Sequence, residues 1–331
     1  MKKLMLIMPK FFDYPELISE ELEGMGYEVD FYDDRPSTKG IIKAIIRVNK
    51  NLINGYIHKY FNSIMENVIK KKYDVVFLIS GQSLSFSKEM LAKLKKSQPQ
   101  ARFILYQWDS MRNFPYIGEM HQFFDRKFSF DKTDCSKYGD LHFLPLFYAK
   151  KYENIGLIKK KEYKYDFCFV GTAHPKKFKF IKQMSVQLQS VYPKQFIYFF
   201  FPSKIVYYYR KLKNPEFKDA TITNFHFTPI KGRDMDDLIT ESRCILDSPQ
   251  DGQLGLTIRV LEALGAKKKL ITTNEDVKNY DFYRPENVYI YNGNFKYDSA
   301  FFKSDYVELD EEIYQKYSLH SWLSSCLGEN E

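Results

Sequence analysis

Cysteine is scarce in this chain of 331 residues, and its four copies are far apart. They stand at Cys135, Cys168, Cys244 and Cys326, a spacing that matches no zinc-binding pattern. Cys168 and Cys244 fall in apolar, strand-like runs, where we expect buried thiols. The sequence therefore predicts no zinc finger, and scattered cysteines of this kind are typical of a reducing compartment.

Long hydrophobic runs are also missing. No stretch reaches the roughly 20 apolar residues that a membrane span requires. The apolar run that begins at Leu4 ends at Pro9, which is too short for a signal peptide and is typical of a first buried strand. We expect a cytoplasmic protein, and the sequence leaves open a peripheral contact with the inner face of the membrane.

The chain carries a basic excess, with 50 Lys and Arg against 42 Asp and Glu and a formal net charge of +8. Such a balance suits nucleic acid, an anionic membrane or phosphorylated ligands. Because there is no zinc-finger spacing and no aromatic signature for binding single strands, we expect no nucleic-acid partner. The hydrophobic content of 44% excludes wholesale disorder, and the length predicts two domains.

Strands and helices alternate along the whole chain, which predicts an α/β protein with parallel sheets. Apolar runs predict strands at 4–8, 27–32, 74–80, 103–107, 126–130, 166–170, 196–201, 244–246, 269–272 and 288–291. Helical periodicity predicts helices at 16–25, 41–69, 87–96, 176–191, 207–213, 235–241, 255–266 and 311–327.

A lysine-rich stretch near the middle divides this pattern in two. We expect an N-terminal α/β domain at 1–150, a basic linker or surface hairpin at 151–164, and a second α/β domain at 165–312. The remaining residues, 313–331, are expected to form a C-terminal helix that could pack back on the N-terminal domain.

The segment 244–266 is the most informative part of the chain. It predicts a short buried strand, a polar loop with two glycines, and a helix that carries Arg259 and Glu262 on one face. Glycines let the backbone approach a ligand closely, and a helix N-terminus suits phosphate. A cation and a hydroxyl-binding carboxylate beside such a loop predict a nucleotide-sugar site.

The order of residues in this segment resembles a known family. Asp247, Gln250, Gln253, Gly255, Leu256, Thr257, Arg259, Glu262 and Gly265, followed by the run 269–274, carry the resemblance. The chain resembles bacterial glycosyltransferases of the GT-B fold from capsule and lipopolysaccharide gene clusters, related to the spore-coat maturation glycosyltransferases. The resemblance implies two Rossmann-like domains facing a central cleft. It also implies sugar transfer from a nucleotide donor to a growing surface glycan such as an O-antigen or capsule.

The resemblance implies a donor site in the second domain. It assigns Glu262 to the ribose hydroxyls, and the donor groups of Arg259 suit phosphate oxygens. The alternative for both residues is a solvated ion pair on the helix surface. The donor-side candidates are Gly171, Thr172, His174, Lys176, Lys177, Asp247, Gln253, Gly255, Leu256, Thr257, Arg259 and Glu262.

Candidates on the acceptor side lie in loops that follow strands of the first domain. Asp13 and Asp109 are candidate general bases for an inverting transfer, with helix capping and turn formation as their alternatives. Gly81, Gln82 and Trp108 complete the set, and Trp108 would either stack on a sugar or fill the domain interface.

The sequence departs from one pattern of that family. Many retaining members carry a first glutamate eight residues before the second, and Leu254 occupies that position here. The stereochemistry of the transfer therefore stays open. There is no Asp-x-Asp motif and no cluster of metal ligands, so we expect a metal-independent enzyme with the nucleotide sugar as co-substrate and no other cofactor.

Two other functions remain open at this point: a nucleotide-sugar epimerase on the same fold, and a non-catalytic module that binds nucleotide or glycan. The expected partners are a nucleotide-sugar donor and a glycan or lipid-linked acceptor. The basic, apolar segments 41–69 and 196–213 would contact an anionic membrane. For 196–213, the alternative is a core strand followed by a tyrosine-rich surface helix.

Overall fold

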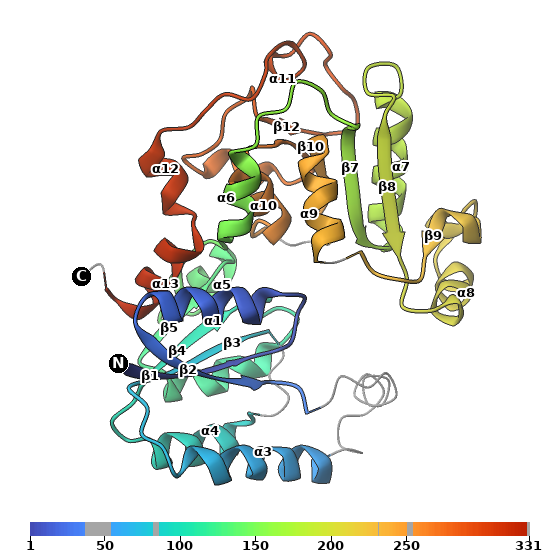
Figure 1. Ribbon diagram of the computed structural model, residues 1–331. Coiled ribbons are helices and arrows are strands. Elements are labelled where there is room, and N and C mark those ends of the chain that lie inside the picture. Colours follow the sequence, from blue (N-terminus) through green and yellow to red (C-terminus); the bar gives the residue numbers. More distant parts are fainter. Residues whose placement is uncertain (37–53, 82–85, 231, 250–253, 330–331) are drawn as a thin grey trace. The chain divides into compact units, whose positions relative to one another are not determined.

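The computed structural model describes residues 1–36, 54–81, 86–230, 232–249 and 254–329 (Figure 1). The chain divides into two compact units. Unit 1 comprises Met1–Pro145 and Trp322–Glu331, and unit 2 comprises Leu146–Ser321. No helix among the described residues has the length and apolar character needed to cross a membrane.

Unit 1 is built on a six-stranded sheet in the order β2-β1-β3-β4-β5-β6, with every pair parallel. Its strands are β1 (Lys2–Met8), β2 (Tyr27–Asp33), β3 (Val75–Ser80), β4 (Arg102–Gln107), β5 (Arg126–Ser129) and β6 (His142–Phe143). Its helices are α1 (Tyr14–Gly24), α3 (Asn54–Val68), α4 (Lys88–Ser97), the 3-10 helix η2 (Pro115–Phe123), α5 (Lys132–Lys137) and most of α13 (Leu319–Leu327).

The central strands of unit 1 are apolar because helices cover both faces of a parallel sheet. All of β3 is buried, as are the last five residues of β1. Local signals start and stop the helices: Pro15 lies in the first turn of α1, and the hydroxyl of Ser87 accepts a hydrogen bond from the Met90 amide at the start of α4. The glycine after α1, Gly26, has a φ of +90°.

Unit 2 has a second parallel sheet in the order β12-β11-β10-β7-β8-β9. Its strands are β7 (Tyr165–Thr172), β8 (Gln195–Phe200), β9 (Phe225–His226), β10 (Ser242–Asp247), β11 (Lys269–Thr272) and β12 (Val288–Ile290). Its helices are α6 (Lys150–Gly156), α7 (Pro175–Leu188), α8 (Lys204–Lys213), α9 (Arg233–Thr240), α10 (Ile258–Gly265), α11 (Ala300–Lys303) and α12 (Glu311–Lys316), with short 3-10 turns η3 (Pro215–Phe217), η4 (Ile222–Asn224) and η5 (Glu275–Asn279). Numbered from β7, this is the strand order of the doubly wound Rossmann sheet.

The ten predicted strands are all present, and the structure adds the two-residue strands β6 and β9. Two other expectations differ from the structure. The segment expected as a linker at 151–164 contains most of α6, because Tyr152 and Ile155 are buried against unit 2. The helix expected at 311–327 is two helices, α12 and α13. Of the helix expected at 41–69, α3 accounts for Asn54–Val68, and residues 41–53 lie outside the described part.

Candidate functional site

The strand order of unit 2 reverses between β7 and β10. The chain continues from β7 to β8 on one side and later returns to β10 on the other side of β7. Ligands of open α/β sheets bind beyond the carboxyl ends of the strands at such a reversal. The loops that leave β7 and β10 there lead into α7 and α10, so the structure brings together the two donor-side segments that the sequence singles out.

Two helices begin at this edge of the sheet. The first residue before α7 is His174, and the first before α10 is Thr257. Neither side chain makes a capping hydrogen bond to its helix in the described structure. Because the first amides of a helix have no partner within the helix and carry partial positive charge, two uncapped helix starts favour a bound anion.

Asp247 ends β10 and is buried, with 5% of its surface exposed. Its two carboxylate oxygens accept hydrogen bonds from the Thr257 hydroxyl at 2.9 Å and the Thr272 hydroxyl at 3.3 Å. Burial raises the pKa of Asp247, while the positive charge of Lys177 opposes this shift. Asp247 therefore joins the ends of β10, β11 and the start of α10.

Asn274 holds the other end of the loop that precedes α10. Its side-chain amide donates to the carbonyl oxygens of Leu254, at 3.0 Å, and Gly255, at 3.5 Å. Gly255 and Leu256 are buried in this turn, and Leu254 is exposed at the position of the missing family glutamate. Gln253 lies outside the described residues, so its predicted role stays a prediction.

Basic side chains from three helices converge on this edge. Burial lowers the pKa of Lys177 in α7, the Asp247 carboxylate opposes this shift, and the charge of Arg259 in α10 lowers the pKa further. Burial also lowers the pKa of His174, with added contributions from Arg210 in α8 and from Lys177. We call Lys177, Arg210 and Arg259 the cationic cluster. The positive charges of Lys177 and Arg259 repel each other, which a bound anion would relieve.

Arg210 is a member of this cluster that the sequence analysis missed. It lies in a tyrosine-rich, lysine-rich segment that the sequence associates with a membrane contact or a surface helix. In the structure its guanidinium donates to the carbonyl of Ala173 at 3.4 Å, in the loop that leaves β7. No local pattern marks this residue, because only the packing of α8 places it beside that loop.

The Arg259–Glu262 pair is present, and Glu262 is buried while Arg259 is partly buried, so it is not a solvated surface pair. The Arg259 Nη1 and the Glu262 Oε2 are 2.6 Å apart, and the exposed fractions of the two side chains are 22% and 4%. Tyr152 of α6 donates its hydroxyl to Glu262 Oε1 at 2.7 Å. Burial and the negative charge of Glu262 raise the pKa of Tyr152, so the phenol remains a donor. The structure shows Glu262 holding Arg259, and its assignment to ribose stays a prediction.

The remaining donor-side candidates lie at the carboxyl end of β7 and the start of α7. Gly171 and Thr172 are the last two residues of β7, and the Thr172 side chain is exposed. Lys176 is exposed in the first turn of α7, whereas Lys177 is half-buried. The predicted residues that the structure describes in these two segments thus share one edge of unit 2.

The acceptor-side candidates gather at the carboxyl edge of the unit 1 sheet. Asp13 immediately precedes α1, and Asp109 follows β4. Their chain neighbours, Tyr14 and Trp108, are in ring contact with centroids 5.6 Å apart. Trp108 also contacts Tyr106 at 6.3 Å, which shows it packed among aromatic side chains.

The position of the Asp109 carboxylate depends on Gly81, which lies beside it. A Cβ atom at Gly81 would lie 2.4 Å from the Asp109 Oδ2, so any larger residue would displace this carboxylate. The Gln107 side-chain amide donates to the carbonyl oxygens of Gly81 and Asp109 and ties the two loops together. Loss of solvation raises the pKa of Asp109, which the positive charge of Arg35 opposes. Gln82 lies outside the described residues.

The described part of the chain contains no group of three or more His, Cys, Asp or Glu residues that could hold a metal ion. Metal independence stays a prediction.

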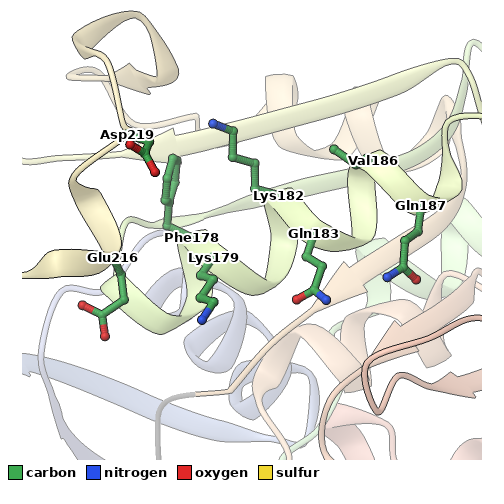
Figure 2. A pocket seen from close by; sticks show the side chains of 8 residues that line it. All are labelled: Phe178, Lys179, Lys182, Gln183, Val186, Gln187, Glu216 and Asp219. Carbon is green, nitrogen blue, oxygen red and sulfur yellow. The ribbon is translucent and has the colours of Figure 1, made fainter.

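An open groove of ≈ 440 Å³ lies elsewhere on unit 2, along α7 and η3 (Figure 2). Two lysines, Lys179 and Lys182, and two acidic residues, Glu216 and Asp219, balance its charge. The groove has no excess of basic side chains, unlike the cationic cluster. The carboxyl edge of the unit 2 sheet is therefore the better candidate site.

Comparisons with known proteins add to this geometry. The sequence matches no protein-family model and no curated protein. Among solved structures, the chain is similar to the lipopolysaccharide outer core galactosyltransferase WaaB, with a TM-score of 0.55, 11% identity, and coverage of 99% of this chain and 100% of that one. It is also similar to HepE of Anabaena in complex with UDP-glucose, with a TM-score of 0.59, 7% identity, and 99% of both chains covered.

A third similar structure is a glycosyltransferase from Rickettsia africae, with a TM-score of 0.53, 11% identity, and coverage of 99% of this chain and 88% of that one. These neighbours extend over both units. Together with the two parallel sheets, they show that the chain has the GT-B fold of two Rossmann-like units.

Proposed function

We propose that this protein is a glycosyltransferase that moves a sugar from a nucleotide-activated donor to a growing surface glycan, such as a lipopolysaccharide O-antigen or a capsule. The observation that carries the proposal is the cationic cluster at the β7/β10 reversal, beside two uncapped helix starts. A nucleoside diphosphate is the leaving group of such a donor, and its negative charge complements these basic side chains.

Each part of the site has a role in this proposal. Lys177, Arg210 and Arg259 would bind the diphosphate and stabilise the negative charge that develops on it as the sugar leaves. Glu262 would orient Arg259 and receive the ribose hydroxyls. The bound UDP and UDP-glucose in the HepE structures support a nucleotide-sugar donor for this fold.

Asp109 is the better of the two candidate bases. Its raised pKa brings it closer to the range in which a carboxylate removes a proton effectively from an acceptor hydroxyl. We propose a glycan or a lipid-linked glycan as the acceptor, with Trp108 at the same edge of unit 1. We further propose that the cationic cluster makes a metal ion unnecessary, so activity should persist in EDTA.

Calorimetric titration with UDP, GDP, CDP, ADP and dTDP tests the proposal. The parent protein should bind at least one of these diphosphates. Lys177→Met and Arg210→Met should each weaken that binding about 10-fold to 150-fold, because a charge-assisted hydrogen bond contributes about 1.5–3 kcal/mol. Lys179→Met is the matched control: this exposed lysine also lies in α7, and its replacement should leave the affinity unchanged.

Equal affinities in the parent and in both cluster variants would contradict the proposed diphosphate site. Turnover assays then distinguish a glycosyltransferase from an epimerase and from a binding module. An epimerase would interconvert the free nucleotide sugar without an acceptor, whereas a transferase needs one. A binding module would catalyse neither epimerisation nor sugar transfer.

A further inference from the structure

Helix α8 presents an apolar stripe to solvent. Ile205 and Leu212 are 81% and 88% exposed, and Tyr208 and Tyr209 are 55% and 62% exposed. Their spacing of three, four and seven residues from Ile205 places all four on one face of the helix. An apolar face of this kind is costly in water unless another surface covers it.

The opposite face of α8 is firmly packed. Tyr207 is 2% exposed and donates its hydroxyl to the Ala220 carbonyl at 3.1 Å. Its ring packs on Phe225 of the edge strand β9, with centroids 5.2 Å apart, and Figure 1 shows α8 beside this strand. The hydroxyl of Ser203 accepts a hydrogen bond from the Val206 amide and caps the helix. The exposed stripe is therefore held outward by an anchored helix.

The charged residues of α8 itself all have one sign. Lys204 flanks the stripe on one side and Lys213 on the other, Lys211 donates to the Ala220 carbonyl, and the ten residues of α8 include no Asp or Glu. Tyrosine and aliphatic side chains bordered by lysine are the composition of helices that lie in the membrane interface. The basic border complements anionic lipid headgroups.

We propose that α8 docks unit 2 on an anionic membrane surface, with Ile205, Tyr208, Tyr209 and Leu212 inserted among the headgroups. A second copy of the chain fits the stripe less well. A ten-residue helix is roughly 15 Å long and 10 Å wide, whereas a stable protein interface buries about 800 Å² on each partner.

This docking face belongs to the same helix as part of the cationic cluster. Arg210 points from α8 to the Ala173 carbonyl in the loop that leaves β7. Docking through α8 thus brings the proposed diphosphate site close to the lipid surface, where a lipid-linked acceptor would be held. The inference stands on the exposed face of α8 and does not depend on the proposed activity.

Co-sedimentation with vesicles tests it. The parent protein should bind vesicles of phosphatidylglycerol and phosphatidylcholine at low salt, and high salt should release it. Ile205→Ser/Leu212→Ser should lower the partition coefficient by about tenfold or more, since two apolar side chains no longer leave water. Lys204→Gln/Lys213→Gln should remove most of the preference for vesicles that contain phosphatidylglycerol over those of phosphatidylcholine alone.

The control is Leu157→Ser/Val186→Ser, which changes two other apolar residues of unit 2 that are 68% and 73% exposed. It should bind vesicles as the parent does. All variants should keep the parent melting temperature, because every changed side chain is exposed. Equal vesicle binding by the α8 variants and the parent would overturn the proposal. So would a self-associating parent whose dimer, but not its vesicle binding, is lost in the Ile205→Ser/Leu212→Ser variant.

Discussion

At the scale of single residues, the buried Arg259–Glu262 pair and the Tyr152 hydroxyl form one polar network inside unit 2. Removing water from such charges is costly, and the network is stable only while every member keeps its partners. Glu262 is the common partner of the other two. This position gives it a structural role in addition to any contact with a ligand.

Glu262→Ala is therefore expected to lower the free energy of unfolding by about 3–5 kcal/mol, because it leaves the Arg259 charge buried without its partner. Chemical denaturation followed by circular dichroism measures this change. Tyr152→Phe should have a smaller effect and lower the free energy of unfolding by about 1–2 kcal/mol, because it removes one hydrogen bond. A Glu262→Ala protein as stable as its parent would show that the pair is solvated in solution.

The lowered pKa of Lys177 predicts a pH dependence for anion binding. The lysine binds an anion while it is protonated, so the affinity falls as the pH rises through its pKa. Because burial and Arg259 place that pKa below the ordinary lysine value of 10.5, the fall should begin earlier than for an exposed lysine. Pyrophosphate affinity measured from about pH 7 to 10 checks this prediction. The Lys177→Met variant should lack this fall in affinity. Parallel profiles for the two proteins would contradict the prediction.

At the scale of elements, the C-terminal end of α10 lies in close contact with the segment that contains Tyr148. A Cβ atom at Gly265 would lie 2.5 Å from the Tyr148 Cγ, and Tyr314 donates its hydroxyl to the Gly265 carbonyl at 2.6 Å. Only glycine leaves room for the Tyr148 ring here. The motif residue Gly265 is thus explained by packing.

Gly265→Ala should lower the free energy of unfolding by roughly 1–3 kcal/mol, because the added methyl group overpacks this contact. Gly24→Ala is the matched control, since Gly24 also ends a helix but has open space around its Cβ position. The control should be unchanged or more stable by about 0.4–1 kcal/mol. Thermal melts of the two variants give the comparison. Equal shifts in melting temperature would show that overpacking against Tyr148 does not destabilise the protein.

At the scale of the whole molecule, the chain leaves unit 1 at Pro145 and returns to it at Trp322. The Trp322 ring is 2% exposed and lies 4.6 Å from the ring of Tyr106 and 5.8 Å from that of Phe77, measured between centroids. Trp322 is thus part of the unit 1 core, although unit 2 separates it in sequence from the rest of that core.

Trp322→Ala should destabilise unit 1 selectively, by about 3–5 kcal/mol. Hydrogen exchange read by mass spectrometry should then show faster exchange in β3 and β4 than in the parent, with β10 and β11 unchanged. Phe301→Ala should give the mirror result, because Phe301 is 1% exposed in the core of unit 2. Uniform acceleration over both units would show that they unfold together.

Much of the fold follows from the sequence alone. Strand and helix periods are local, so the ten main strands, most helices and the alternation that predicts parallel sheets can all be recognised in the chain. The segment from β10 to α10 is also local, because Asp247, Thr257 and Arg259 lie within 13 consecutive residues.

Tertiary packing decided the rest. Arg210 and Tyr152 reach the site from helices far along the chain, and nothing in their own neighbourhoods marks them. The same packing buries Glu262 beside Arg259 and stabilises α6 in the segment expected as a linker. Burial and long-range contact depend on which elements lie side by side, and a local sequence pattern contains no information about the partner that will cover it.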